Sequence, residues 1–182
     1  TQLIGAKIIN EGAITIPARL ITEFVTSLPK TTVTLKVTDS KLHLTADGYN
    51  STINGAVADD FPELPTINEK TAVSYAIDTA ALKQAVTQTV LTASNDTTRP
   101  VLTGVYWHSH DGALYLAATD GYRLSEKRLV TTKSDVAAII PTSTLQEVLR
   151  MLNDDINEVE VLFDESQVRF RLNDAEITSR LI

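Results

Sequence analysis

The chain has 182 residues, 43% of them hydrophobic, which is enough for one large or two small packed domains. Its 16 Lys and Arg against 23 Asp and Glu give a formal charge of -7, which excludes a uniformly basic surface that coats nucleic acid. The absence of cysteine excludes disulfides, thiol nucleophiles and Cys-ligated zinc.

The N-terminal segment begins at Thr1 and is apolar-rich from Leu3 to Ile9, without the charged-then-apolar pattern of a secretory signal. No apolar run reaches the roughly 18 residues of a membrane helix. We therefore expect a soluble, cytoplasmic protein. Because the sequence starts inside an apolar segment, we also expect it to be a piece of a longer chain.

Three segments have the apolar spacing of short, one-sided helices. Asp78 or Thr79 can cap the second helix at its N-terminus. A short apolar strand is expected before each helix. The positions predicted to face inward are, in chain order, Ile21, Phe24, Val25 and Leu28; Leu82, Ala85, Val86, Thr89 and Val90; and Leu145, Val148, Leu149 and Leu152.

Alternating apolar segments after each helix predict hairpins. The first runs from 33 to 44 and turns at Asp39-Ser40, and the last runs from 159 to 172. Between them, segments 101–108 and 113–118 flank Asp111-Gly112, a dipeptide suited to a tight hairpin turn. The predicted unit is a strand, a helix and then several antiparallel strands.

Two stretches, 14–56 and 139–182, are versions of this unit. A shift of 124 residues carries Pro17 onto Pro141 and Glu23 onto Glu147. After the helix the second stretch is two residues longer, and a shift of 126 carries the segment 39–44 onto 165–170. Such self-similarity is typical of a chain built from copies of one unit.

A polar, proline-containing stretch, 58–66, separates the first unit from the other two. We place the domain boundary near Lys70. The segment after it would hold two units. The segment before it would be half a domain, whose helix and sheet lack their partners.

Two local motifs resemble the beta subunit of bacterial DNA polymerase III, the sliding clamp. They are Thr98-Arg99-Pro100-Val101-Leu102-Thr103-Gly104-Val105 and Leu116-Ala117-Ala118-Thr119-Asp120-Gly121-Tyr122-Arg123-Leu124-Ser125. The segment 14–19 and Asp60-Phe61-Pro62 extend the match through the chain. Together with the repeat, the motifs make the resemblance specific.

The resemblance implies an α+β DNA-clamp fold of repeated βαβββ units, with antiparallel sheets outside and helices lining the inner face. Residues 1–70 would be the second half of the family's first domain, and residues 71–182 nearly all of its middle domain. The first half of domain one and the whole third domain would be absent. The ring closes through those domains, so this chain should not form it alone.

The implied function is that of a processivity factor in bacterial DNA replication, which encircles duplex DNA without sequence specificity and needs no cofactor. It belongs to the DNA polymerase III complex without catalysing polymerisation, since the clustered carboxylates of two-metal phosphoryl transfer are missing. The implied partners are double-stranded DNA, the polymerase III catalytic subunit, the clamp loader, repair polymerases, and ligase or mismatch-repair proteins. The intact protein would be a homodimeric ring in the cytoplasm, associated with the nucleoid.

By resemblance, the polar helix faces line the hole and contact phosphates without reading sequence. Ordinary solvated helix faces would look the same from the residues alone. Arg99, in the loop after the second helix, either touches DNA or anchors its own loop through a carboxylate. The expected DNA-facing residues are Arg19, Lys83, Gln84, Thr87, Gln88, Arg99 and Arg150.

The turn from Thr119 to Leu124 is the predicted docking site for short linear peptides. Gly121 permits a positive backbone dihedral, and Asp120 can bond its own backbone. In the family, apolar peptide anchors rest on the leucines that match Leu102 and Leu124. The remaining pocket residues implied by the resemblance are Thr119, Gly121, Tyr122 and Arg123. Family members often have histidine where Tyr122 stands.

Two other classes compete with this reading. A metal-dependent hydrolase could use His108 and His110 on one strand face, or the carboxylates Asp59, Asp60, Glu63 and Asp120. Each has a simpler explanation as a hairpin tip, an acidic linker or a turn. A non-replicative, β-rich interaction domain would share the repeat, but it would not need the turn from Thr119 to Leu124.

Overall fold

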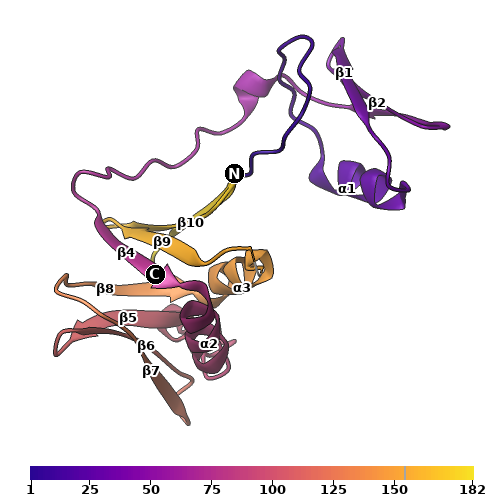
Figure 1. Ribbon diagram of the computed structural model, residues 1–182. Helices are drawn as coiled ribbons and strands as arrows, with labels where there is room; N and C mark the ends of the chain where they lie inside the picture. The colour runs from indigo at the N-terminus through magenta and orange to yellow at the C-terminus, as the bar shows by residue number, and fades with distance from the viewer. Residues whose placement is uncertain (154) are drawn as a thin grey trace. The chain divides into compact units, whose positions relative to one another are not determined.

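Two βαβββ units follow one another in the C-terminal part of the chain (Figure 1). The first consists of β4 (Val73–Asp78), α2 (Thr79–Val90), β5 (Gly104–His110), β6 (Ala113–Thr119) and β7 (Leu124–Thr131). The second consists of β8 (Ala137–Pro141), α3 (Thr142–Met151), β9 (Glu158–Phe163), β10 (Gln167–Leu172) and β11 (Ala175–Arg180). This computed structural model describes residues 1–153 and 155–182.

By its internal contacts the chain divides into two parts. The large unit comprises Thr1–Ile4 and Pro65–Ile182, and the small unit comprises Gly5–Leu64. Residues 65–69 belong to the large unit because side chains of β10 hold them: Arg169 donates to the Pro65 carbonyl at 3.2 Å, and Arg171 pairs with Glu69.

The two βαβββ units of the large unit exchange their first strands. One sheet has the order β11-β10-β9-β4 and the other β7-β6-β5-β8, all antiparallel. Strand β4 therefore belongs in sequence to the first unit but pairs with β9 of the second, and β8 pairs with β5 of the first. Neither sheet is complete without the other unit, so the two must fold together.

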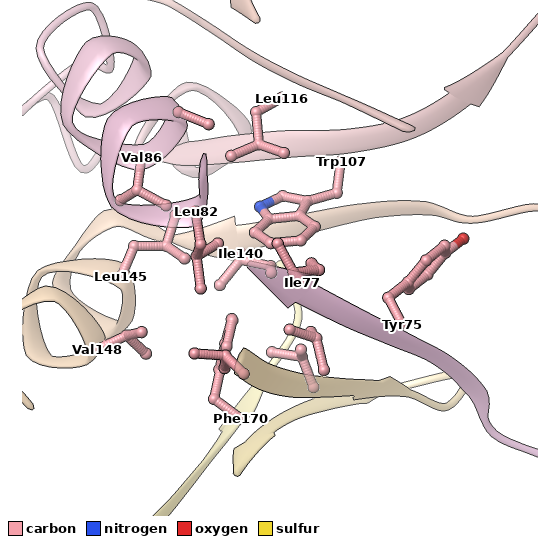
Figure 2. Packing of buried hydrophobic residues seen from close by; sticks show 14 of the residues in the cluster. Tyr75, Ile77, Leu82, Val86, Trp107, Leu116, Ile140, Leu145, Val148 and Phe170 are labelled. Carbon is pink, nitrogen blue, oxygen red and sulfur yellow. The ribbon is translucent and has the colours of Figure 1, made fainter. Parts of the chain in front are cut away.

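One hydrophobic core joins both sheets and both helices. Figure 2 shows the Trp107 ring among Leu116, Ile140 and Ile77, with side chains of α2 and α3 closing one side. Trp107 is fully buried, and its ring centroid lies 5.6 Å from that of Phe163. Buried aromatic pairs at this separation stabilise a core beyond their area alone.

The small unit repeats the helix and the three strands that follow it, while the segment before its helix forms only a single bridge. It contains α1 (Ala18–Ser27), β1 (Thr34–Thr38), β2 (Lys41–Ala46), β3 (Tyr49–Asn54) and the 3-10 turn η1 (Ala58–Asp60). Its three strands form a sheet in the order β1-β2-β3. Its core is small: Leu42, Leu44 and Ile53 are buried, and α1 has no buried residue.

The structure confirms the internal repeat. Helices α1 and α3 both have ten residues and start 124 positions apart, while β2 and β3 precede β10 and β11 by 126 positions. Individual hydrogen bonds repeat as well: Ala56 N donates to Thr15 O at 2.8 Å, and Ile182 N donates to Ile139 O at 2.9 Å. The two copies therefore have the same local connections.

Several details of the sequence prediction hold. Asp78 is the N-cap of α2 and accepts from the backbone N–H of Ala81 at 2.8 Å. The turns at Asp39-Ser40 and Asp111-Gly112 both have positive φ angles, as tight hairpin turns require. Leu145 and Val148 of α3 are buried, as is Leu152 directly after the helix.

Other details are wrong. Val25 is predicted to face inward and is exposed, as are Leu35 and Val37 of the alternating strand β1. The strand expected before α1 is reduced to a single bridge between Thr15 and Ala56. Both differences have one cause, because in the large unit the equivalent positions are covered and paired by a second βαβββ unit.

The strand expected to start at Val101 starts at Gly104 instead. Residues Pro100–Leu102 form a 3-10 helix, η2, with Pro100 at its first position. Proline is favoured there because its missing N–H would have no helical partner. Among the described residues, no helix is long and apolar enough to span a membrane.

Ile77 of β4 tests the strand exchange, because it is fully buried in the core shared by both sheets. Ile77→Ala should lower the free energy of unfolding of the large unit by about 2–5 kcal/mol through lost burial and a residual cavity. Denaturant unfolding followed by the fluorescence of Trp107, the single tryptophan, measures this. Leu91→Ala, at an exposed position, is the matched control and should change stability little.

Candidate docking pocket and helix surface

The turn between β6 and β7 is held by its own side chains. Thr119 Oγ1 donates to the Arg123 carbonyl at 2.7 Å and accepts from Gly121 N at 3.0 Å. Asp120 Oδ1 accepts from the backbone N–H groups of Tyr122 and Arg123 at 2.9 and 3.1 Å. Gly121 has φ +95°, which side-chain-bearing residues rarely adopt. The turn is thus rigid although it is exposed.

The Asp120 carboxylate accepts most of the hydrogen bonds in this turn and pairs with Arg123. The hydrogen bonds from Tyr122 and Arg123 backbone N–H groups, helped by the Arg123 guanidinium, hold the pKa of Asp120 below its ordinary value. The Arg123 Nε atom lies 3.0 Å from Asp120 Oδ2. Asp120 is therefore ionised at neutral pH and serves the turn as an acceptor.

A small apolar pocket of about 180 Å³ opens beside the turn. It lies where η2, β5, β6 and the start of β7 meet. Its lining residues are Val101, Leu102, Gly104, Tyr106, Ala117, Ala118, Thr119 and Leu124. Leu124 and Val101 are largely exposed, at 69% and 58%, so apolar surface continues outward from the pocket. The geometry suits a short apolar side chain from another molecule.

The strands explain why Gly104 and Tyr106 line this pocket. A Cβ on Gly104 would come within 2.8 Å of the Ile140 carbonyl oxygen, so only glycine lets β8 approach β5 there. Tyr106 pairs with Ala117 across the ladder, and both side chains lie on the face that carries Thr119.

Hydroxyl groups tie the pocket to the end of α2. Thr92 Oγ1, just after the helix, lies 3.0 Å from the Ala118 carbonyl and 2.6 Å from Ser125 Oγ. Ala118 is the residue before the turn, and Ser125 is the second residue of β7, just after Leu124. Both ends of the turn are therefore fixed to the helix.

The structure brings three of the predicted pocket residues together: Leu102, Thr119 and Leu124 line the pocket. Gly121, Tyr122 and Arg123 shape the same turn but do not line it, and Tyr122 is 96% exposed. The sequence reasoning missed Val101, Gly104, Tyr106, Ala117 and Ala118. The alternation of β5 and β6 was the available signal, since residues paired across a ladder share a face.

Arg99 combines two contacts. Its Nε atom lies 3.2 Å from Asp96 Oδ2, and its Nη1 atom approaches the Gly121 position of the turn between β6 and β7. Asp96 also accepts from the backbone N–H and hydroxyl of Thr98, and these bonds lower its pKa. Arg99 thus anchors its own loop and lies beside the turn.

The expected DNA-facing side chains of α2 share one exposed strip of the helix, at positions 83, 84, 87 and 88. Arg19 of α1 pairs with Glu23 at 2.6 Å, and Arg150 of α3 pairs with Glu147. Glu23 and Glu147 are equivalent in the repeat. In the part of the chain that the structure describes, Lys83 forms no ion pair. The positive charge of these surfaces is therefore modest.

The histidines of the competing enzyme hypothesis have local partners. His108 stacks on Tyr106 and Tyr115, with Nε2 at 3.4 Å from Glu126, and His110 lies 3.3 Å from its neighbour Asp111. Across residues 1–153 and 155–182, no three His, Cys, Asp or Glu residues gather where they could hold a metal ion. The donor set for metal-dependent hydrolysis is not assembled among these residues.

The large unit is thus a pair of βαβββ units with an apolar pocket beside one turn. Comparison with protein-family models identifies the family of the chain. Residues 76–182 match the model for the central domain of the DNA polymerase III beta subunit, and residues 2–65 match the model for its N-terminal domain. The chain belongs to the DNA polymerase III beta subunit family. The predicted family and fold class are thereby confirmed.

Relatives and solved structures agree with this family. The chain is 34% identical to the Beta sliding clamp of Bacillus subtilis over 175 residues, covering 94% of the chain and 46% of that protein. It is 31% identical to that of Streptococcus pneumoniae serotype 4, covering 98% of the chain and 48% of the relative.

Among solved structures, the DNA polymerase sliding clamp from Bacillus subtilis has a TM-score of 0.86 at 33% identity, covering 97% of the chain and 47% of that structure. The beta chain of DNA polymerase III from Streptococcus pneumoniae has a TM-score of 0.88 at 30% identity, with the same coverage. The chain spans about half the length of the relatives it matches.

The turn from Thr119 to Leu124 should loosen in acid. Because the folded-state pKa of Asp120 is lowered, the carboxylate stabilises the turn above the ordinary value of 3.8, and this contribution is lost as the pH falls through the lower, folded pKa. We expect the Tyr122 amide resonance to titrate with a midpoint below 3.8 in two-dimensional NMR. Asp120→Asn should abolish this titration.

Arg123→Gln is the matched control. It keeps the two backbone hydrogen bonds, which are the larger causes of the shift, so it should raise the midpoint only partly. A wild-type midpoint at or above 3.8 would contradict the role assigned to Asp120.

Proposed function

We propose that this chain is part of a processivity factor of bacterial DNA replication, a sliding clamp that encircles duplex DNA and docks other replication proteins. The observation that carries the proposal is the apolar pocket formed by η2 and the turn from Thr119 to Leu124 on a pair of interlocked βαβββ units. Membership of the beta subunit family supports it. In this assignment residues 1–70 are the second half of the first clamp domain, and residues 71–182 are most of the middle domain.

The proposed clamp holds DNA by topology. Its helices present polar side chains to the phosphates: Lys83, Gln84, Thr87 and Gln88 from α2, with Arg19 and Arg150 from α1 and α3. Since Arg19 and Arg150 are each paired with a glutamate, the lining attracts DNA weakly. Non-specific phosphate contacts are equivalent at every position along the duplex, so they let a ring move along it.

The pocket receives short peptides from the clamp's partners. An apolar side chain would enter beside Leu102 and Leu124, and the polar edge at Thr119 would accept or donate hydrogen bonds to the peptide backbone. The proposed donors of such peptides are the polymerase III catalytic subunit, the clamp loader, repair polymerases, and ligase or mismatch-repair proteins. The clamp itself catalyses no bond chemistry and acts in the cytoplasm at the nucleoid as a homodimeric ring of longer chains.

A chimera tests the ring. Residues 1–182 would replace the matching segment of the Bacillus subtilis Beta sliding clamp, and the chimera would be loaded by its clamp loader onto nicked circular DNA. We expect the protein to stay with the circle during gel filtration and to be lost once a restriction enzyme linearises it, because a topological link has no end to hold it. Retention on linear DNA would contradict the proposal, and the uncut circle is the control.

Calorimetry with a short peptide from a replicative polymerase tests the pocket. This chain alone should bind at least tenfold more weakly than the chimera, because by resemblance the rest of the pocket wall comes from the third domain. In the chimera, Leu124→Asp should weaken binding more than tenfold, since burying a leucine contributes about 1.5–3 kcal/mol. Tyr122→Ala should change it less, because Tyr122 lies outside the pocket lining. Equal affinity of chain and chimera would refute the first expectation.

A further inference from the structure

The apolar pocket continues onto the solvent face of the sheet β7-β6-β5-β8. Tyr106 of β5 pairs with Ala117 of β6, and Ala117 pairs with Glu126 of β7. Residues paired across neighbouring strands point to the same face of a sheet. Tyr106 and Ala117 both line the pocket, so this row of paired residues adds a carboxylate to the surface beside it.

The ring of Tyr106 is held in place by a stack of aromatic side chains. Its centroid lies 4.9 Å from that of His108 at an interplanar angle of 10°, and His108 in turn stacks on Tyr115 at 5.5 Å and 21°. Along β5, His108 and Gly104 lie on opposite sides of Tyr106, and Gly104 lines the pocket. His108 therefore covers the ring face that points away from the pocket and leaves the other face open toward it.

The Glu126 carboxylate lies close to this stack. Its Oε1 atom is 3.4 Å from His108 Nε2, so the side chain reaches across β6 toward the strand that carries Tyr106. In residues 1–153 and 155–182 this histidine is the ion-pair partner found for Glu126. A histidine neutralises a carboxylate only when it is protonated, and half of the Glu126 side chain stays exposed. The row beside the pocket therefore carries a negative charge.

The cations around the pocket already have partners of their own. On the side of the turn, Arg99 pairs with Asp96 at 3.2 Å and Arg123 pairs with Asp120 at 3.0 Å. On the sheet, Arg128 is one step further from the pocket than Glu126, and its Nη2 atom donates to Thr131 Oγ1 at 3.0 Å. The uncompensated charge next to the pocket is thus that of Glu126, and it favours a cationic ligand group.

We propose that Tyr106 and Glu126 form a subsite for an arginine side chain of the peptide whose apolar residue enters the pocket. The inference rests on the proposed peptide docking. Between the two side chains lies only the methyl group of Ala117, and two strand spacings separate their backbones by roughly 10 Å. A planar guanidinium in this space would lie against the open face of the Tyr106 ring and donate two hydrogen bonds to the carboxylate.

The spacing of the sheet determines where in the peptide this arginine belongs. Tyr106 follows Gly104 by two residues, which is roughly 7 Å along the strand. An extended peptide advances roughly 3.3 Å per residue, so the arginine should stand within three residues of the apolar anchor. The subsite would select among partner peptides that share the same anchor.

NMR titration of the isotope-labelled chain tests the subsite, because chemical shifts also report weak binding. The probes are short peptides from a replicative polymerase with one apolar anchor and either arginine or citrulline at one of the three residues on each side of it. Citrulline keeps the shape of arginine without its charge. At one of these positions the arginine peptide should bind about fivefold more tightly, as expected for an exposed cation–π contact together with an exposed ion pair.

Variants separate the two contacts. Glu126→Gln should reduce the preference for arginine to less than twofold, and Tyr106→Leu, which keeps the pocket apolar, should reduce it in part. Glu165→Gln is the matched control, since Glu165 is exposed in a turn of the other sheet, and it should leave the preference unchanged. Trp107 fluorescence verifies that each variant is folded.

Two results would overturn the inference, and they are distinguishable. If both peptides shift the amide resonances of Leu102 and Leu124 but bind equally at every position, or if Glu126→Gln keeps the full preference, peptide docking stands and the arginine subsite is wrong. If neither peptide shifts these resonances, the pocket does not receive peptides and the subsite is refuted together with the proposed docking.

Discussion

The exchange of β4 and β8 between two βαβββ units is the constraint on which the large unit depends. Each exchanged strand puts its side chains into the core of the sheet it joins, so Ile77 and Ile140 are both fully buried. A chain that forms its hydrogen bonds within one unit only, as the small unit does, leaves strand edges and apolar side chains in water. Both the burial of apolar side chains and the pairing of strand edges thus require a second unit, which explains why two units are combined in the large unit.

The same exchange supports the candidate site. Strand β8 lies against β5 at Gly104, where no side chain would fit, and this contact fixes the wall of the pocket that includes Tyr106. On the other side, Thr92 and Ser125 bind the turn to the end of α2. In the proposed clamp, the helix that faces DNA and the turn that receives peptides therefore share one rigid connection.

Much of this could be predicted from the sequence because the repeat and the turn chemistry are local. Asp78 as a helix cap and Asp111-Gly112 as a hairpin turn follow from residue types at adjacent positions. The pocket lining could be predicted only in part, because Val101 and Tyr106 reach it through strand register and a 3-10 turn, which depend on distant pairing. Likewise the exposure of Val25 and Leu35 depends on which segments pack around them rather than on their own spacing.

The charge distribution of the chain explains how the proposed clamp would contact DNA. The chain carries a formal charge of -7, so its average field repels a duplex, and any attraction must come from the helix surfaces. On those surfaces the repeat places a glutamate at equivalent positions of α1 and α3, and each neutralises the nearest arginine. A surface of amides, hydroxyls and one lysine on α2 displaces few counterions from the DNA when it approaches phosphates. In the proposed clamp, closure of the ring would then provide retention on DNA, and the apolar pocket would provide an affinity for partners that depends little on salt.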